Sequence, residues 1–166
     1  MEILDIYDDN GNLTGKQIER NNNKIYLGPN EHVAIVIIFI ENSEGKFLMQ
    51  KASKQKDGLY AATGGHVCSG ETPKKTIIRE VNEEIGIDIT NDNIIYLGNV
   101  ILGTPIRHMF YLQKDIDLED IKIQKEEVEE VCYLTYEQIE ELIQKELLRP
   151  SNKLVLERVI EYKNNH

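Results

Sequence analysis

Residues 64–87 read GGHVCSGETPKKTIIREVNEEIGI, and the rest of the chain is organised around this stretch. Thr72 followed by Pro73 predicts the start of a helix, because a Thr side chain can cap a helix and Pro is tolerated at the first helical position. An apolar stripe then recurs at helical spacing, formed by Ile77, Ile78, Val81 and Ile85. Gly86 is expected to end the helix.

Three carboxylates, Glu80, Glu83 and Glu84, stand beside this stripe and share one helical face within about 6 Å along the axis. Most charge runs of this kind are solvated surfaces. That interpretation gives no role to the upstream glycines, to Glu71 or to Arg79. A hard divalent cation would relieve the repulsion, since Mg²⁺ takes carboxylate oxygens together with waters and substrate phosphates.

The loop before the helix supports the metal hypothesis. Glycine lets a backbone carbonyl turn toward an ion, so the Gly65 carbonyl is a candidate ligand. Arg79 can hold Glu71 through charge-assisted hydrogen bonds and thereby fix the loop against the helix start. The stretch therefore predicts a cation site between a glycine loop and a helix.

The same residues resemble the Nudix box, G-x5-E-x7-R-E-U-x-E-E-x-G-U, where U is aliphatic. Every fixed position matches, and these positions are Gly65, Glu71, Arg79, Glu80, Val81, Glu83, Glu84, Gly86 and Ile87. A chance match at a given start is below roughly one in 10⁸, so composition alone does not explain it. The resemblance implies an α/β (α+β) Nudix fold, an α/β/α sandwich with a mixed central sheet. It also implies a metal-dependent pyrophosphohydrolase that cleaves the diphosphate linkage of a nucleoside diphosphate derivative or a related small molecule.

The resemblance also implies roles for individual residues. Glu80, Glu83 and Glu84 would bind Mg²⁺ or Mn²⁺ together with the Gly65 carbonyl. The residues of the box expected to serve catalysis are Glu80, Glu83, Glu84, Arg79 and Glu71, the last two by ordering the loop. Which residue acts as the general base stays open, because Nudix enzymes differ in this respect.

Candidates outside the box are fewer. A further acidic ligand often comes from elsewhere in such proteins, and Glu127, with Glu130 after it, is the candidate. Three lysines before the glycine loop could attract phosphates or simply be solvated, and these are Lys51, Lys54 and Lys56. Tyr60 offers a stacking face for a base or a packing ring, and His66 is either a site residue or a hydrogen-bonded structural histidine.

Two alternatives to hydrolysis stay open. The N-terminal region, His32 and Gly65-His66 resemble the isopentenyl-diphosphate-isomerase-like branch of Nudix proteins. The isomerase motif, however, places a catalytic Cys where this chain has Gly64, and Cys68 lies on the wrong side of the His. The other alternative is a non-catalytic Nudix-fold binding module. Such modules commonly lose box glutamates, which this chain keeps.

Composition restricts the partners. The 166-residue chain is 40% hydrophobic and carries a net charge of −10, which disfavours nucleic acid and membrane surfaces as partners. The same charge repels an anionic diphosphate, so bound cations must bring in that small-molecule substrate. Dimers are common for folds of this kind, so a homodimer is compatible with the sequence.

Cysteine usage and the N-terminus indicate a cytoplasmic protein. Cys68 and Cys132 are the only cysteines, which is not a secreted disulfide framework. The first residues lack the basic start and long apolar region of a signal peptide. The most apolar run, residues 33–40, is far too short to span a bilayer.

The remaining segments predict a single Nudix hydrolase domain over residues 1–166. It would begin with a hairpin over 1–20 that turns at Asn10-Gly11, and a polar loop over 21–30 follows. Strands are expected over 31–40, 46–51, 94–102, 107–113 and 131–134. After the box at 65–87, helices are expected over about 135–163. The first begins at Thr135 with a capping box to Gln138, and the second covers 151–163.

Overall fold

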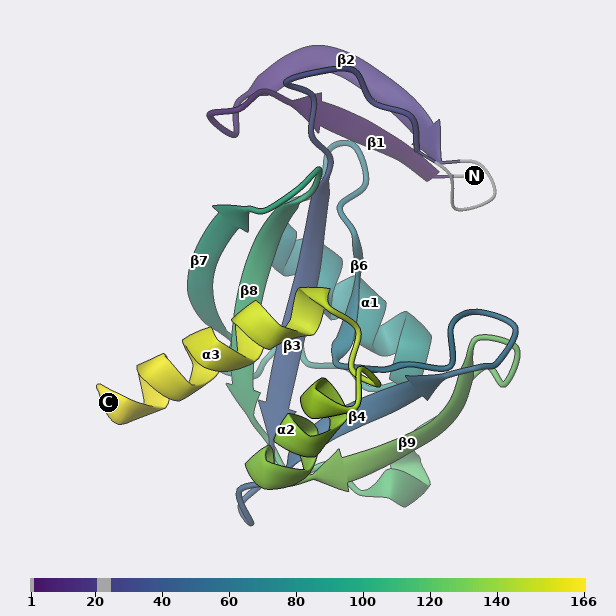
Figure 1. Ribbon diagram of the computed structural model, residues 1–166, viewed down its shortest axis with the longest axis vertical. Coiled ribbons are helices and arrows are strands. Elements are labelled where there is room, and N and C mark those ends of the chain that lie inside the picture. Colours follow the sequence, from purple (N-terminus) through teal and green to yellow (C-terminus); the bar gives the residue numbers. More distant parts are fainter. Residues whose placement is uncertain (1, 21–24) are drawn as a thin grey trace.

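The computed structural model describes residues 2–20 and 25–166 (Figure 1). Residue 1 of the predicted hairpin and residues 21–24 of the predicted polar loop lie outside the described residues. The described strands form two sheets, of two and seven strands. The smaller sheet is the antiparallel hairpin of β1 (Glu2–Tyr7) and β2 (Leu13–Arg20), which confirms the predicted N-terminal hairpin.

The larger sheet is mixed and is built around β3 (Ala34–Glu41). β3 runs parallel to β8 (Ile106–Gln113) and antiparallel to β4 (Phe47–Ala52) and β6 (Thr63–His66). The outer strands are β7 (Ile95–Ile101) beside β8, and β5 (Tyr60–Ala61) and β9 (Val128–Leu134) beside β4. A short 3₁₀ turn, η1 (Leu118–Asp120), precedes β9.

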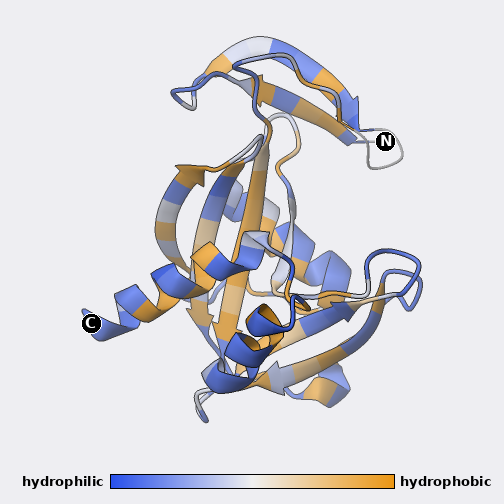
Figure 2. Cartoon of the chain, in the orientation of Figure 1, coloured by the Kyte–Doolittle hydropathy of each residue, from blue (hydrophilic) through white to orange (hydrophobic). Residues whose placement is uncertain are grey.

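Helices cover both faces of the sheet, as Figure 1 shows. α1 (Pro73–Ile85) packs on one face, where its apolar stripe contacts the even-numbered residues of β3. α2 (Tyr136–Gln144) and α3 (Ser151–Asn164) cover the other face, with the odd-numbered residues of β3. β3 is hydrophobic along most of its length in Figure 2, as a strand covered on both faces must be. This arrangement is the predicted α/β/α sandwich.

Local signals placed the helices correctly. The Thr72 side chain accepts a hydrogen bond from the Lys75 N–H at 3.2 Å, and α1 ends at Gly86, whose φ is 71°. The capping box between Thr135 and Gln138 is present at the start of α2. The left-handed conformation at Gly86 favours glycine, which explains why the helix stops there.

The strand predictions were less accurate. β3 begins at Ala34 and not at residue 31, and β9 begins at Val128 and not at residue 131. β5 and β6 were missed altogether, because Gly64 and Gly65 lower the intrinsic strand preference of β6. Pairing with β3 makes these residues a strand, with Gly65 opposite Val36.

The N-terminal hairpin lies over the loop of the box. The Ser69 N–H donates to the Ile3 carbonyl at 2.7 Å, and Gln17 Nε2 donates to Ser69 Oγ at 2.8 Å. Ser69 Oγ in turn donates to Asp5 Oδ1 at 2.8 Å. The hairpin is therefore fixed against the segment that connects β6 with α1. In the part of the chain described, no helix is long and apolar enough to cross a membrane.

Candidate active site

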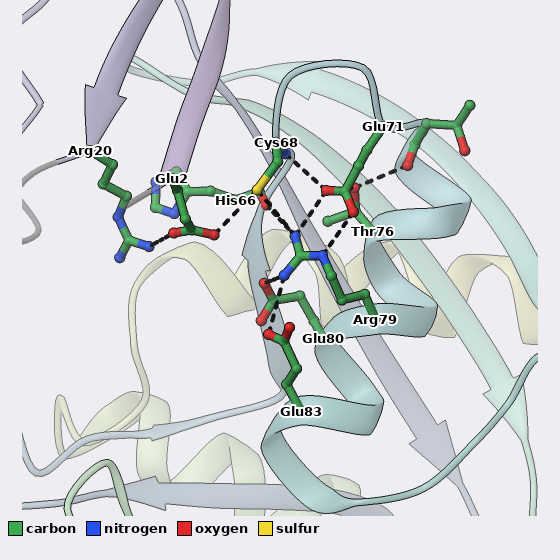
Figure 3. A network of polar contacts seen from close by, with 10 residues as sticks. Glu2, Arg20, His66, Cys68, Glu71, Thr76, Arg79, Glu80 and Glu83 are labelled. Atoms are coloured by element: carbon green, nitrogen blue, oxygen red, sulfur yellow. Dashed lines mark hydrogen bonds and ion pairs between the residues drawn. The ribbon is translucent and has the colours of Figure 1, made fainter.

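Arg79 of α1 lies at the centre of the site and binds Glu71 with two hydrogen bonds (Figure 3). Its Nε donates to Glu71 Oε2 at 2.8 Å and its Nη2 to Glu71 Oε1 at 2.9 Å. Glu71 Oε1 also accepts from the Cys68 N–H at 3.0 Å and from Thr76 Oγ1 at 3.1 Å. The hydrogen bonds from Arg79 lower the pKa of Glu71 to about 2. Glu71 is therefore an ionised anchor for the loop, the arrangement that the sequence predicted.

The other edge of the Arg79 guanidinium faces the carboxylates of α1. Nη1 donates to Glu80 Oε1 at 2.9 Å and to Glu83 Oε2 at 3.2 Å, while Nη2 reaches the His66 carbonyl at 3.2 Å. Figure 3 shows Glu80 and Glu83 directed toward this edge from successive turns of the helix. The Arg79 guanidinium thus connects the glycine-containing strand β6, the loop that follows it and the acidic face of α1.

The three glutamates differ in exposure. The Glu83 side chain is 57% exposed and the Glu80 side chain is 12% exposed. Glu84 has a buried oxygen, Oε2, without any hydrogen-bond partner. Burial raises the pKa of Glu80, an effect that the repulsion of Glu83 increases. Burial is the main cause that raises the pKa of Glu84, and the neighbouring Glu80 carboxylate is the second cause.

These properties fit a divalent cation. A buried carboxylate oxygen without a partner is costly, and a cation would both satisfy it and relieve the repulsion between Glu80 and Glu84. Among the residues that the structure describes, no three acidic, His or Cys side chains already converge in the way a metal requires.

The glycines of β6 make room for these carboxylates. A Cβ at Gly65 would lie 2.3 Å from the carboxyl carbon of Glu80. A Cβ at Gly64 would lie 2.3 Å from the Val36 carbonyl oxygen in the neighbouring strand. No side chain fits at either position without displacing one of these groups, and this explains the Gly-Gly pair.

A cavity of about 710 Å³ opens at this edge of the sheet. The following residues, which the sequence suggested as candidates for the site, line this cavity: Gly65, His66, Lys56, Glu80, Glu83, Glu84 and Glu127. Glu127 forms an ion pair with Lys56 at 3.4 Å. The structure therefore brings Glu127 and the box glutamates to one cavity.

Lys51, Lys54, Tyr60 and Glu130, candidates outside the box, do not line this cavity. Lys51 forms an ion pair with Glu129 at 3.3 Å, and its Nζ lies 5.9 Å from the centre of the Tyr60 ring. Glu130 lies opposite Lys51 in the ladder between β4 and β9. The β4–β9 ladder thus holds Lys51 and Glu130 in a separate group with Tyr60.

Several cavity residues were not predicted, because they come from distant parts of the chain. The hairpin contributes Glu2 and Arg20, which form an ion pair at 2.6 Å. Arg149, just before α3, and Ser151 and Asn152, at its start, also line the cavity. No local motif marks any of them. Only the docking of the hairpin and of α3 reveals their position.

Cys68 and His66 have the properties of uncharged groups. Burial, with the hydrogen bond from Cys68 Sγ to Glu2 Oε2 at 3.3 Å, raises the pKa of the Cys68 thiol to about 12. Burial, with the nearby Arg20, lowers the pKa of His66 to about 4. At neutral pH Cys68 is a thiol and not a nucleophilic thiolate.

Known proteins resemble this chain over most of its length. A family model described as the NUDIX domain matches residues 30–159. An uncharacterized Nudix hydrolase of Listeria monocytogenes is 33% identical over 148 residues, covering 86% of this chain and 85% of the relative. Nudix hydrolase 3 of Arabidopsis thaliana is 28% identical over 162 residues, covering 87% of this chain and 21% of the relative.

Solved structures share the fold. DR0079 from Deinococcus radiodurans has a TM-score of 0.77 and 21% identity, covering 95% of this chain and 97% of that one. The NUDIX domain of NrtR from Shewanella oneidensis, solved with ADP ribose, has a TM-score of 0.60 and 17% identity, covering 79% of this chain and 88% of that one. Together with the complete box and the geometry around Arg79, the family match leads to one conclusion. This chain belongs to the Nudix hydrolases, enzymes that cleave a diphosphate linkage and generally use a divalent metal ion.

Proposed function

We propose that this protein hydrolyses a small-molecule diphosphate at the carboxylates of Glu80, Glu83 and Glu84, with Mg²⁺ or Mn²⁺ bound to them. The observation that carries the proposal is the buried Glu84 Oε2, which has no partner and lies next to the buried Glu80. A bound cation would stabilise the ionised form of these buried carboxyl groups and satisfy the oxygen without a partner. The cavity volume of about 710 Å³ suits a small molecule better than a macromolecule.

Each residue has a distinct part in this proposal. The three glutamates and the Gly65 carbonyl would hold the metal, and Glu127 would supply a further carboxylate from the same cavity. The ion, when bound, neutralises developing charge on the phosphoryl oxygens and makes a bound water more nucleophilic. Arg79 and Glu71 keep the glycine strand and α1 in register. This role matters because phosphoryl transfer depends mainly on positioning and electrostatics.

The geometry argues against the isomerase alternative. A catalytic Cys at position 64 would place its Cβ 2.3 Å from the Val36 carbonyl oxygen. The nearby Cys68 is protonated at neutral pH, and its thiol is hydrogen-bonded to Glu2. Neither position offers the nucleophile or base that this chemistry needs. The complete set of box glutamates likewise favours turnover over a non-catalytic binding module.

A cytoplasmic location and a single domain over residues 1–166 are part of the same proposal. Cys68 and Cys132 are both free, as the reducing cytoplasm would keep them. The N-terminal hairpin contributes Glu2 and Arg20 to the cavity, so we place it within the domain.

The experiment is a phosphate-release screen with Mg²⁺ and then Mn²⁺, using nucleoside triphosphates, nucleotide sugars, ADP-ribose, dinucleoside polyphosphates and isopentenyl diphosphate. Glu83→Gln runs beside the wild type, and Glu141→Gln, an exposed mid-helix change on α2, is the matched control. We expect metal-dependent release that Glu83→Gln reduces by at least about 10²-fold and Glu141→Gln leaves intact. Full activity of a folded Glu83→Gln variant would refute the metal-ligand assignment.

A further inference from the structure

Arg107 of β8 is a buried cation that has no counter-ion among the residues that the structure describes. The residue is 6% exposed, and its Nε and Nη1 are fully buried without a hydrogen-bond partner. Nη2 is not among these buried atoms, so it is the nitrogen that solvent can reach. Burial lowers the pKa of Arg107, but arginine stays protonated in proteins. Folding therefore keeps an unsatisfied charge in the interior.

The sheet register connects Arg107 with the cavity. Ile35 of β3 pairs with His66 of β6 on one side and with Arg107 on the other, and Arg107 pairs with Val100 of β7. Directly paired residues point to the same face, and Met109, two residues along β8, packs on the face that α3 covers. His66 and Ile35 line the cavity. Arg107 thus lies one strand beyond the cavity wall, roughly 10 Å from His66 across two strand spacings.

The three cations that line the cavity in the described part of the chain, unlike Arg107 beyond its wall, have protein partners. These ion pairs are Arg20 with Glu2 at 2.6 Å, Lys56 with Glu127 at 3.4 Å and Arg149 with Asp57 at 3.1 Å. The neighbours that the register gives Arg107, Ile35 and Val100, are apolar. A structural arginine in such surroundings would be expected to have a carboxylate or carbonyl partner. An anion from outside the protein is the remaining partner.

We propose that Arg107 binds a second anionic group of the substrate, a phosphate or carboxylate on the moiety attached to the diphosphate. The proposal rests on the proposed function, since it concerns the same substrate. With the diphosphate at the glutamates, a group that extends past Ile35 would reach the guanidinium. Arginine recognises phosphate and carboxylate through paired N–H donors. The substrate class is therefore a diphosphate compound with an additional anionic end.

This assignment predicts opposite effects on stability and binding. Met in place of Arg107 keeps the long stem and removes a charge that has no partner. We expect Arg107→Met to unfold at the same or a higher temperature than wild type, because such a replacement of an unsatisfied buried charge is neutral or stabilising. A structural role would lower the unfolding temperature. Arg158→Met on α3, outside the cavity-lining set, is the control.

The binding test uses inorganic pyrophosphate in EDTA, measured by isothermal titration calorimetry. We expect Arg107→Met to weaken binding at least fivefold and Arg158→Met to leave it unchanged. Unchanged affinity in Arg107→Met, or no binding to wild type at millimolar pyrophosphate, would overturn the proposal. If Arg107→Met fails to fold, Arg107→Gln, which also removes the charge, replaces it, and unchanged affinity in that variant overturns the proposal equally. The titration contains no metal and measures no turnover, so failure of hydrolysis and failure of this site are distinguishable.

Discussion

Replacing Gly65 with Ala should lower the catalytic rate strongly while changing the stability of the fold only slightly. The new Cβ would lie 2.3 Å from the Glu80 carboxyl carbon and 2.5 and 2.6 Å from its oxygens. Gly65 is not among the residues with positive φ, so Ala meets no backbone strain there. The obstructing group is the end of a flexible side chain. It must move by about 1 Å to reach ordinary contact distance.

The magnitudes follow from this displacement. A misplacement of about 1 Å in a catalytic constellation can cost roughly 10²-fold in rate, or about 2.7 kcal/mol of activation free energy. An off-rotamer Glu80 costs about 0.5–1.5 kcal/mol in the free energy of unfolding. The lower entropy of the unfolded Ala chain offsets about 0.4–1 kcal/mol of this. The unfolding temperature should therefore change by less than about 4 °C.

Gly64→Ala is the matched comparison. Its Cβ would lie 2.3 Å from the Val36 carbonyl oxygen, and a backbone atom held in the β3–β6 ladder cannot turn aside. Overpacking of this kind costs about 1–3 kcal/mol of stability, or up to about 10 °C in the unfolding temperature. The assay combines thermal unfolding with kcat/KM on the substrate found by the screen. A Gly65→Ala variant that keeps at least half of the wild-type kcat/KM would show that Glu80 is not displaced as expected. A loss of stability in Gly65→Ala as large as that in Gly64→Ala would contradict the same prediction.

Two further predictions concern the loop. Cys68→Ala should change kcat/KM by less than about threefold, since the protonated thiol takes no part in the chemistry; a loss of two orders of magnitude would reopen the question of a nucleophile. Glu71→Gln should lower the free energy of unfolding at pH 7 by up to about 3 kcal/mol, because Arg79 holds the pKa of Glu71 near 2 against an ordinary 4.5. This contribution is complete above pH 4.5 and is lost as the pH falls toward 2, so urea unfolding curves of the two proteins should converge in acid. A constant difference across that range would contradict the ion-pair explanation.

Local chemistry made the central helix and its loop predictable from sequence. Thr72, Pro73 and Gly86 act on neighbouring backbone groups, so their effects do not depend on the rest of the fold. The contact between Arg79 and Glu71 was predictable for the same reason, because it joins residues eight positions apart across one helix start. The box therefore determined the family and its main chemistry.

Strand edges and the far walls of the cavity were not predictable in this way. The β6 glycines form a strand only because β3 offers a partner, and β9 gains three residues by pairing with β4. Glu127 lines the cavity whereas Glu130 does not, although both lie in one acidic run. Which of two such neighbours faces a site depends on strand register, which long-range pairing decides.

The sequence alone determined the pairing of Arg79 with Glu71, both limits of α1 and the acidic face of that helix. Tertiary structure alone decided that Glu84 has a buried oxygen without a partner and that Arg107 is a buried cation. It also decided that the N-terminal hairpin and α3 complete the cavity with Arg20 and Asn152. The physical reason is that capping and helical spacing are set by near neighbours, whereas burial depends on segments that meet only when the sheet assembles.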